Sequence, residues 1–264
     1  MKQQLRFFNT ILISFGFDLK KFIYSFRGLA YYFYDFRVLK YQQKKSNRRF
    51  VFGKPNLCLD DRFTGSGTVN GHYFYQDWLV ASHIFQNNPD VHVDVGSRVD
   101  GFVTHVASFR TIRVIDIRPL KTRIPQIDFV SADLMQPLKD ELIGCCDSLS
   151  CLHTLEHFGL GRYGDPVNYD GYLVGLNNLN SLLKQNGKFY FSVPIGLQRI
   201  EFNGHRVFSC SYLLELFDGK FKIDSFSFVD DSGDLHTDIS LKKEDILNNF
   251  GCTYGCGIFE MTKI

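Results

Sequence analysis

The chain has 264 residues, 44% of them hydrophobic, and a net charge of only +2. This size fits one large α/β domain with an appendage, or two small domains, and is long enough for a real hydrophobic core. The charge is unevenly spread, because residues 1–50 hold eleven Lys or Arg against Asp18 and Asp35, a net charge of about +9. The remainder is therefore at about −7, which predicts a basic arm joined to a near-neutral or acidic body.

The cysteine pattern and the hydropathy exclude several classes of protein. Seven cysteines form no Cys-x-x-Cys pair, which favours reduced thiols in a cytosolic chain over a disulfide framework. The apolar stretch from Leu5 to Phe17 is interrupted by polar residues and is too short to cross a bilayer. It also lacks a convincing secretory cleavage site, so we expect neither a signal peptide nor a membrane span there.

Residues 1–70 are predicted to be a basic, aromatic N-terminal extension with a linker, and residues 71–264 to be the main domain. Leu19 to Tyr41 can form one or two helices in which Phe and Tyr alternate irregularly with Lys and Arg. Such a helix can lie on an anionic membrane surface, pack on the protein's own body, or cap a dimer. The sequence carries no nucleic-acid-binding motif, so no nucleic-acid partner is expected, and it leaves the oligomeric state open.

The main domain alternates helices and strands, in the pattern of a mostly parallel sheet. A helix from His72 to Gln86 is predicted to end at Asn87-Asn88-Pro89. Strands are expected at 91–95, 112–117, 127–131, 146–151 and 188–193, with helices near 100–109 and from Asp170 to Lys184, closed by Asn186-Gly187. After a helix at Ser211–Phe217, strands at Phe221–Asp230 and Gly257–Thr262 can form an antiparallel edge. The predicted fold class is α/β, with a Rossmann-like, doubly wound sheet.

Three of the predicted strands end in residues that suit a nucleoside. The first strand ends at Gly96, where backbone can approach a ligand closely. The second ends at Asp116, about 20 residues on, where a carboxylate can accept hydrogen bonds from ribose hydroxyls. The third ends at Asp133, which can reach an adenine edge. A nicotinamide dinucleotide is the main rival, but the loop after Gly96 lacks the Gly-x-Gly-x-x-Gly pattern that a pyrophosphate needs.

The run His153-Thr154-Leu155-Glu156-His157 follows the fourth predicted strand. It also satisfies His-x-x-Glu-His, a zinc-protease pattern that needs both histidines on one helical face. Because it comes directly after a strand, we expect a strand-to-helix turn and no metal site.

Together these motifs resemble the class I S-adenosylmethionine-dependent methyltransferases over roughly residues 72–264. The resemblance is carried by the strand-end residues, the Leu155-Glu156-His157 turn and the fifth strand, Lys188-Phe189-Tyr190-Phe191-Ser192-Val193-Pro194. It is closest to a poorly characterised branch associated with surface-polysaccharide genes. The marks of that branch are Gly71-His72-Tyr73-Phe74-Tyr75-Gln76-Asp77, Asp94-Val95-Gly96-Ser97 and Phe202-Asn203-Gly204-His205-Arg206-Val207.

The resemblance implies a cytoplasmic enzyme that transfers a methyl group from S-adenosylmethionine to a hydroxyl of a sugar, nucleotide-sugar or lipid-linked glycan. If the basic arm binds lipid, we expect a peripheral position on the inner face of the membrane. The implied cofactor-binding residues are Asp94, Gly96, Ser97, Gly101, Asp116, Ile117, Asp133, Leu134 and His153. The implied catalytic residues are His157, Glu156 and His205, with His157 or His205 as the proton acceptor; an orienting role for His157 is the alternative.

Two loops on the same rim can contact the acceptor. In the insertion from Gly159 to Tyr172, Tyr163 can stack on a sugar and Asp165 can bind hydroxyls, although an ordinary surface loop is an alternative. Arg206 can hold a phosphate or carboxylate through its planar fork, or can have a structural role.

The chain departs from the family in the first loop. Arg98 and Asp100 stand where the family usually has glycines. The alternative hypothesis is therefore a catalytically inactive Rossmann-like scaffold that binds a partner in glycan assembly.

Overall fold

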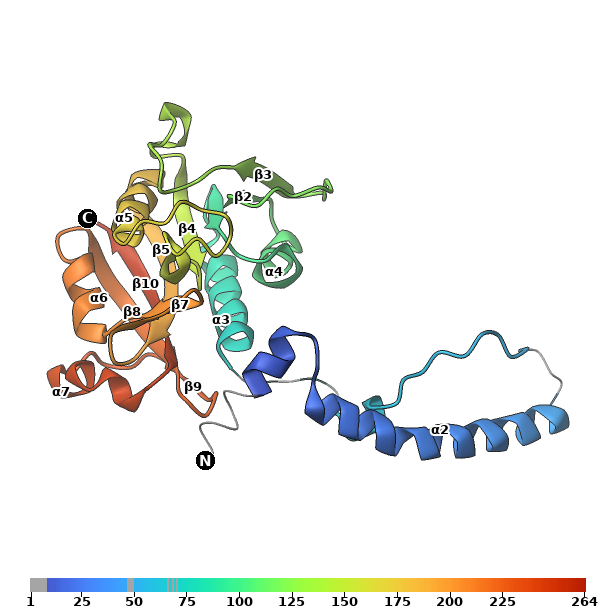
Figure 1. Cartoon of the computed structure of the whole chain (residues 1–264). Helices are drawn as coiled ribbons and strands as arrows, with labels where there is room; N and C mark the ends of the chain where they lie inside the picture. Colours follow the sequence, from blue (N-terminus) through green and yellow to red (C-terminus); the bar gives the residue numbers. More distant parts are fainter. Residues whose placement is uncertain (1–8, 47–49, 66, 68, 70) are drawn as a thin grey trace. The chain divides into compact units, whose positions relative to one another are not determined.

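A computed structural model describes residues 9–46, 50–65, 67, 69 and 71–264. The chain divides into two compact units, Met1–Thr68 and Val69–Ile264 (Figure 1). Each unit is described by itself.

The first unit is built on one continuous helix, α2 (Leu19–Lys45). The chain returns along this helix, so that the Phe63 ring lies 5.4 Å from the ring of Tyr24. Gly28 is buried where the backbone at Leu59 packs closely against the helix. A Cβ at this position would lie 1.7 Å from the carbonyl oxygen of Leu59, so only glycine fits. Within the described part of the chain, no helix combines the length and the hydropathy that are needed to cross a bilayer.

The second unit contains an eight-stranded sheet in the order β3-β2-β1-β4-β5-β10-β8-β9. The first five strands of that order are parallel, and β10 is antiparallel to both β5 and β8. This arrangement confirms the predicted fold class, a Rossmann-like sheet with an antiparallel C-terminal edge. The strands are β1 (His92–Val95), β2 (Ile112–Asp116), β3 (Ile127–Ser131), β4 (Cys146–Leu152), β5 (Leu183–Ile195), β8 (Phe221–Val229), β9 (Leu235–His236) and β10 (Gly255–Lys263).

Helices cover both faces of this sheet, as Figure 1 shows. Side chains alternate between the faces, since successive residues of a strand point in opposite directions. In β2, Ile112 and Val114 pack with one apolar layer, and Ile115 packs with the other. The first layer includes α3 (His72–Asn87) and α4 (Thr104–Ala107); the second includes α5 (Gly171–Leu182) and α6 (Cys210–Phe217), with α7 (Lys243–Leu247) beside it.

The structure corrects three details of the sequence prediction. The helix expected near 100–109 is a wide turn, Val99–Val103, followed by the single turn of α4, because Gly101 has non-helical dihedral angles of −124° and −119°. Helix α5 ends earlier than predicted and β5 begins at once, so Asn186-Gly187 lies inside a strand. A two-stranded hairpin, β6 (Arg199–Glu201) with β7 (His205–Val207), was not predicted.

The central position of β4 leads to a stability prediction. Leu149 is fully buried in β4, whereas Leu197 is 75% exposed. We expect Leu149→Ala to lower the free energy of unfolding by about 2–5 kcal/mol, because the substitution leaves a cavity in the core. The matched Leu197→Ala should change it by less than about 0.5 kcal/mol. Urea unfolding followed through Trp78, the single tryptophan, measures both, and equal effects would contradict the assigned core.

Candidate functional site

A cavity of about 640 Å³ lies over the carboxyl ends of the parallel strands. Its walls come from the segments that directly follow β1, β2, β3 and β4 and from one face of α3. Nine of the predicted site residues line it: Gly96, Ser97, Gly101, Asp116, Ile117, Asp133, Leu134, His153 and His157. Tyr163 and Asp165, from the insertion, line it as well. The volume is within the usual range for a small-molecule site.

The loop after β1 is held from below by Asp94. This buried carboxylate accepts hydrogen bonds from the backbone N–H of Ser97 (3.1 Å) and from the hydroxyls of Ser97 (2.8 Å) and Ser150 (2.6 Å). Burial raises the pKa of Asp94 to about 7, although these hydrogen bonds oppose the shift. Asp94 does not line the cavity, so its predicted direct contact with a cofactor is corrected to support of the loop.

Gly96 meets two requirements that exclude larger residues. Its φ angle is +77°, and a Cβ there would lie 2.2 Å from the Cγ2 atom of Thr154. A side chain would therefore be both strained and in collision with the turn after β4. This glycine lets the ends of β1 and β4 come together at the cavity.

Arg98 and Asp100, the departures from the family loop, pair with each other. The Arg98 guanidinium donates to both carboxylate oxygens of Asp100, at 2.9 and 2.6 Å, and both side chains are exposed. Both residues line the cavity, and the fork of Arg98 is engaged there by Asp100.

Asp116 has a partner that the sequence reasoning did not consider. The Nε atom of Arg118 donates to Asp116 Oδ1 (3.0 Å), and the guanidinium contacts Oδ2 as well. The same guanidinium donates to the carbonyl oxygen of Gly96 (3.1 Å) and lies 4.7 Å from the centre of the Tyr163 ring. Only the spacing of two residues between Asp116 and Arg118 could have signalled this ion pair in advance.

The third strand contributes an acid with apolar neighbours. Asp133 Oδ1 accepts the backbone N–H of Met135 (2.8 Å). Leu134 is buried and lines the cavity, together with Ile117 from the segment after β2. The cavity thus combines apolar side chains with two carboxylates, and small-molecule sites commonly have such an apolar lining with a few polar groups.

The segment after β4 forms the predicted turn. The residues Leu155–His157 make one turn of 3-10 helix, and His153 has a φ angle of +46°. The buried Glu156 accepts a hydrogen bond from His153 Nδ1 (2.7 Å) and lies 3.7 Å from His157 Nε2. Burial opposes a charge on His153, but the neighbouring Cys256 and Glu156 outweigh it and raise the pKa of His153 well above its usual value. Glu156 does not line the cavity, so its predicted role facing an acceptor is corrected to orienting His153.

His157 reaches the cavity with one ring nitrogen already engaged. Its Nδ1 atom lies 2.7 Å from the carbonyl oxygen of Gly204. Because a carbonyl oxygen can only accept a hydrogen bond, Nδ1 must carry the hydrogen. The Nε2 atom therefore carries the lone pair. Burial lowers the pKa of His157, an effect that Glu156 and Gly204 oppose and that Arg162 and His153 reinforce.

The insertion is organised by Asp165. Its carboxylate accepts the backbone N–H groups of Gly159 (3.0 Å), Gly161 (3.2 Å) and Tyr163 (3.1 Å). Asp165 therefore holds this loop at the wall of the cavity, and its expected role in binding hydroxyls stays a prediction. The Tyr163 ring also lies at the cavity, nearly perpendicular to the ring of His157, at a centroid distance of 5.5 Å.

The two candidates from the β6–β7 hairpin do not line the cavity. The buried guanidinium of Arg206 donates to the carbonyl oxygens of Phe158 (2.6 Å) and Tyr169 (2.9 Å), so it fastens the insertion instead of binding an anion. His205 lies 3.3 Å from a carboxylate oxygen of Glu201 within the hairpin. Both predicted ligand-facing roles are corrected.

One face of α3 completes the site and was missed. Tyr73, Gln76 and Asp77 line the cavity from helical positions three and four apart, which place them on one side of the helix. Gln76 donates to Asp77 (3.1 Å) and accepts from the Ser192 hydroxyl (2.6 Å), and burial raises the pKa of Asp77 to about 6. Their spacing within the predicted helix was the available signal.

Several solved structures are similar to this chain at low sequence identity. The N-methyltransferase NodS from Bradyrhizobium japonicum WM9, in complex with S-adenosylhomocysteine, is 12% identical with a TM-score of 0.48, over 73% of this chain and 88% of that one. The 1,6-didemethyltoxoflavin-N1-methyltransferase of Burkholderia thailandensis is 13% identical with a TM-score of 0.46, over 74% and 79%. The [4+2]-cyclase SpnF is 13% identical with a TM-score of 0.49, over 71% and 81%. The fold assignment rests on the strand order and helix layers described above.

No curated protein matches the sequence. A family profile, described as Caenorhabditis protein of unknown function, DUF268, matches residues 116–253. The matched segment runs from the end of β2 almost to the start of β10 and includes Asp133, His153 and His157. Because the match covers just over half of the 264 residues, the chain belongs to the DUF268 family.

Proposed function

We propose that this chain is an S-adenosylmethionine-dependent O-methyltransferase whose acceptor is a hydroxyl of a sugar, nucleotide-sugar or lipid-linked glycan. The observation that carries the proposal is the cavity at the strand ends, with Gly96, Asp116 and Asp133 on its wall. These are the positions at which the sequence predicts backbone approach, ribose recognition and adenine recognition. When bound, S-adenosylmethionine supplies an electrophilic methyl group.

The residues present fit this cofactor. The cavity offers about 640 Å³, and the positive φ angle of Gly96 keeps the first loop free of a side chain where backbone would approach the ligand. Asp116 and Asp133 would accept from hydroxyl and amino donors, and Ile117 and Leu134 would cover the faces of an apolar ring. Arg98 and Asp100 line the same cavity, and their mutual ion pair would lie beside the cofactor.

Arg118 would compete with the ribose hydroxyls for Asp116. Its guanidinium engages both oxygens of Asp116, so ribose hydroxyls would have to share the carboxylate or displace the arginine. Arg118 stacks on Tyr163, so displacement would also move the insertion at the mouth of the cavity. Cofactor entry and acceptor entry would then be linked through one side chain.

His157 is the residue best placed to accept the proton of an acceptor hydroxyl. Its Nδ1–H is fixed by the Gly204 carbonyl, which leaves Nε2 as the proton acceptor. Because burial lowers its pKa, the ring is neutral at pH 7 and can act as a base. The Tyr163 ring lies beside it, with the guanidinium groups of Arg118 and Arg162 over the ring at 4.7 and 5.2 Å, so a sugar would stack on Tyr163 only after one of them moves.

The cofactor part of the proposal predicts a specific loss of affinity. Asp116→Asn keeps the shape of the side chain but removes its charge, and we expect it to weaken S-adenosylmethionine binding by about 1–3 kcal/mol. The control is Asp128→Asn, an exposed acid of the neighbouring strand that pairs with Arg113. Calorimetry with S-adenosylmethionine and S-adenosylhomocysteine measures both variants. Failure of the unaltered chain to bind either compound would instead favour the inactive scaffold.

The acid–base part predicts a loss of rate without a loss of cofactor affinity. His157→Ala should lower methyl transfer by about 100-fold or more, while the exposed His105→Ala should leave it unchanged. The test is transfer of labelled methyl groups to a panel of nucleotide-sugars and lipid-linked glycans. In the unaltered chain the rate should fall only below about pH 6.5, since protonation of His157 needs a more acidic solution than an ordinary histidine. A base role for His157 is wrong if the variant retains full activity.

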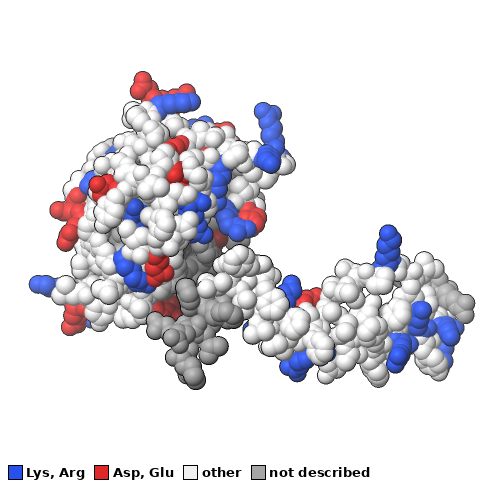
Figure 2. Space-filling view, in the orientation of Figure 1, with Lys and Arg blue, Asp and Glu red and all other residues white. Residues whose placement is uncertain are grey.

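We also propose that the first unit makes peripheral contact with the inner face of an anionic membrane. Helix α2 presents large exposed apolar side chains, including Phe26 (73% exposed) and Tyr34 (67%). Lys and Arg side chains are spread along the same unit, as the blue atoms in Figure 2 show. Aromatic rings at the interface with cations on the headgroups are the features that bind a helix to such a surface.

Charge reversal on α2 tests this contact in the full chain. Lys21, Arg37 and Lys44 are exposed, and changing all three to Glu should weaken sedimentation with anionic liposomes by about 3 kcal/mol, at roughly 1 kcal/mol for each lost cation. The matched control reverses Lys121, Lys139 and Lys242, which are exposed in the second unit. Binding by the unaltered chain should also weaken as salt rises, because exposed charges are screened. Equal sedimentation of both triple variants would exclude this role for α2.

A further inference from the structure

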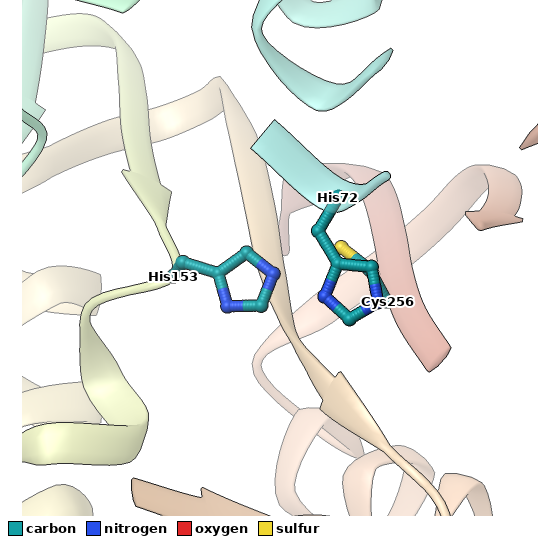
Figure 3. Close-up of side chains that lie close together, drawn as sticks. All are labelled: His72, His153 and Cys256. Atoms are coloured by element: carbon teal, nitrogen blue, oxygen red, sulfur yellow. The ribbon is translucent and has the colours of Figure 1, made fainter. Parts of the chain in front are cut away.

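Three metal-ligating side chains from distant parts of the sequence meet beside the cavity. His72 is the first residue of α3, His153 follows β4, and Cys256 lies near the start of β10. Their ligand atoms all lie within 4.8 Å of one another. Figure 3 shows a ring nitrogen of His153 directed toward the ring of His72, with the Cys256 sulfur next to them. The two ring centres are 5.1 Å apart, with planes inclined by 10°.

His153 is prepared for a ligand on the nitrogen that faces this cluster. Its Nδ1 atom is bonded to Glu156, whereas its Nε2 atom is buried and has no hydrogen-bond partner. A carboxylate that fixes one nitrogen of a histidine and leaves the other for an ion is the usual outer-shell arrangement of a metal site. A buried nitrogen without a hydrogen-bond partner destabilises the folded chain, and a bound ion would remove that cost.

A divalent ion can also take the place of the proton with which His153 balances Glu156 in the absence of metal. Glu156 is 1% exposed, and its Oε2 atom has no hydrogen-bond partner within the described residues. Cys256 is fully buried and becomes an anion when it binds a metal. A divalent ion would balance the Glu156 carboxylate and the Cys256 thiolate, which leaves the buried group neutral. Buried charges that are balanced in this way are far less costly than an isolated one.

We propose that His72, His153 and Cys256 bind a zinc ion, with Glu156 orienting His153. Two imidazoles and one thiolate suit zinc, whereas magnesium and calcium prefer oxygen ligands. Ligand atoms around a tetrahedral zinc ion are about 3.3–3.8 Å apart, so the largest separation in the cluster, at most 4.8 Å, would contract by up to about 1.5 Å. Three protein ligands leave a fourth position for water or another oxygen ligand.

This site shares His153 with the predicted cofactor contacts, whereas His72 and Cys256 do not line the cavity. His153 belongs to the cluster and also lines the cavity, next to Tyr73, whose ring centre lies 5.1 Å away. The short turn from His153 to His157 resembles a zinc-protease motif in sequence, yet His157 takes no part in the cluster. The inference does not rest on methyl transfer, and zinc binding can be measured without cofactor or acceptor.

Metal binding by the full chain tests the proposal. After dialysis against a chelator, the chain should take up one zinc ion, measured by calorimetry and elemental analysis. Replacement with cobalt should give the visible bands of a tetrahedral site and a near-ultraviolet thiolate charge-transfer band. Cys256→Ser should abolish that band and weaken zinc binding by at least about 100-fold, because loss of an outer-shell partner alone costs 10–100-fold.

Matched controls separate ligation from folding. Cys252→Ser alters another buried cysteine nearby, and His83→Gln alters another histidine of α3; both should bind zinc as the unaltered chain does. Glu156→Gln should weaken zinc by about 10–100-fold and keep the thiolate band. If Cys256→Ser does not fold, the cobalt spectrum of the unaltered chain still decides the question. A spectrum without the thiolate band, no retained zinc, or unchanged affinity in folded Cys256→Ser would overturn the proposal.

Discussion

The parallel pairing of β1 between β2 and β4 is the constraint on which the rest of the second unit depends. Asp94 in β1 is in register with Val114 on one side and Ser150 on the other. Because the three strands run in the same direction, their carboxyl ends meet at one edge of the sheet. A cavity with walls from four separate segments can form only there. A shift of one residue in this register would turn every side chain to the opposite face.

A buried layer of polar side chains beneath that edge fixes the same register. His92 lies 2.8 Å from the Ser148 hydroxyl and 3.1 Å from that of Ser150, which in turn donates to Asp94. Buried polar groups are costly unless they are hydrogen-bonded, so this layer tolerates only one alignment of β1 and β4. The alignment also sets Gly96 against the turn that carries His153. The geometry of the site is therefore a consequence of bonds made below it.

The turn after β4 connects the two proposed chemistries. His157 faces the cavity and would accept a proton, whereas His153 faces the cavity on one side and Cys256 on the other. Glu156 lies between the two histidines and is within 4 Å of both rings. An ion at His153 would change the electrostatic field at His157. A chain that binds both a metal and a cofactor would therefore couple the two sites through one buried carboxylate.

The sequence by itself determined the sheet, the cavity position and the strand-end residues Gly96, Asp116 and Asp133, because these follow from local periodicity and from glycines and acids at strand ends. It did not reveal that Arg118 would form an ion pair with Asp116, or that Arg206 would be buried against backbone carbonyls. Each depends on where a long side chain finds a partner, and a spacing in sequence does not specify that. The meeting of His72, His153 and Cys256 was decided only by the tertiary structure. The start of α3, the end of β4 and the start of β10 come together through strand order, and no local pattern encodes a contact between residues so far apart in the chain.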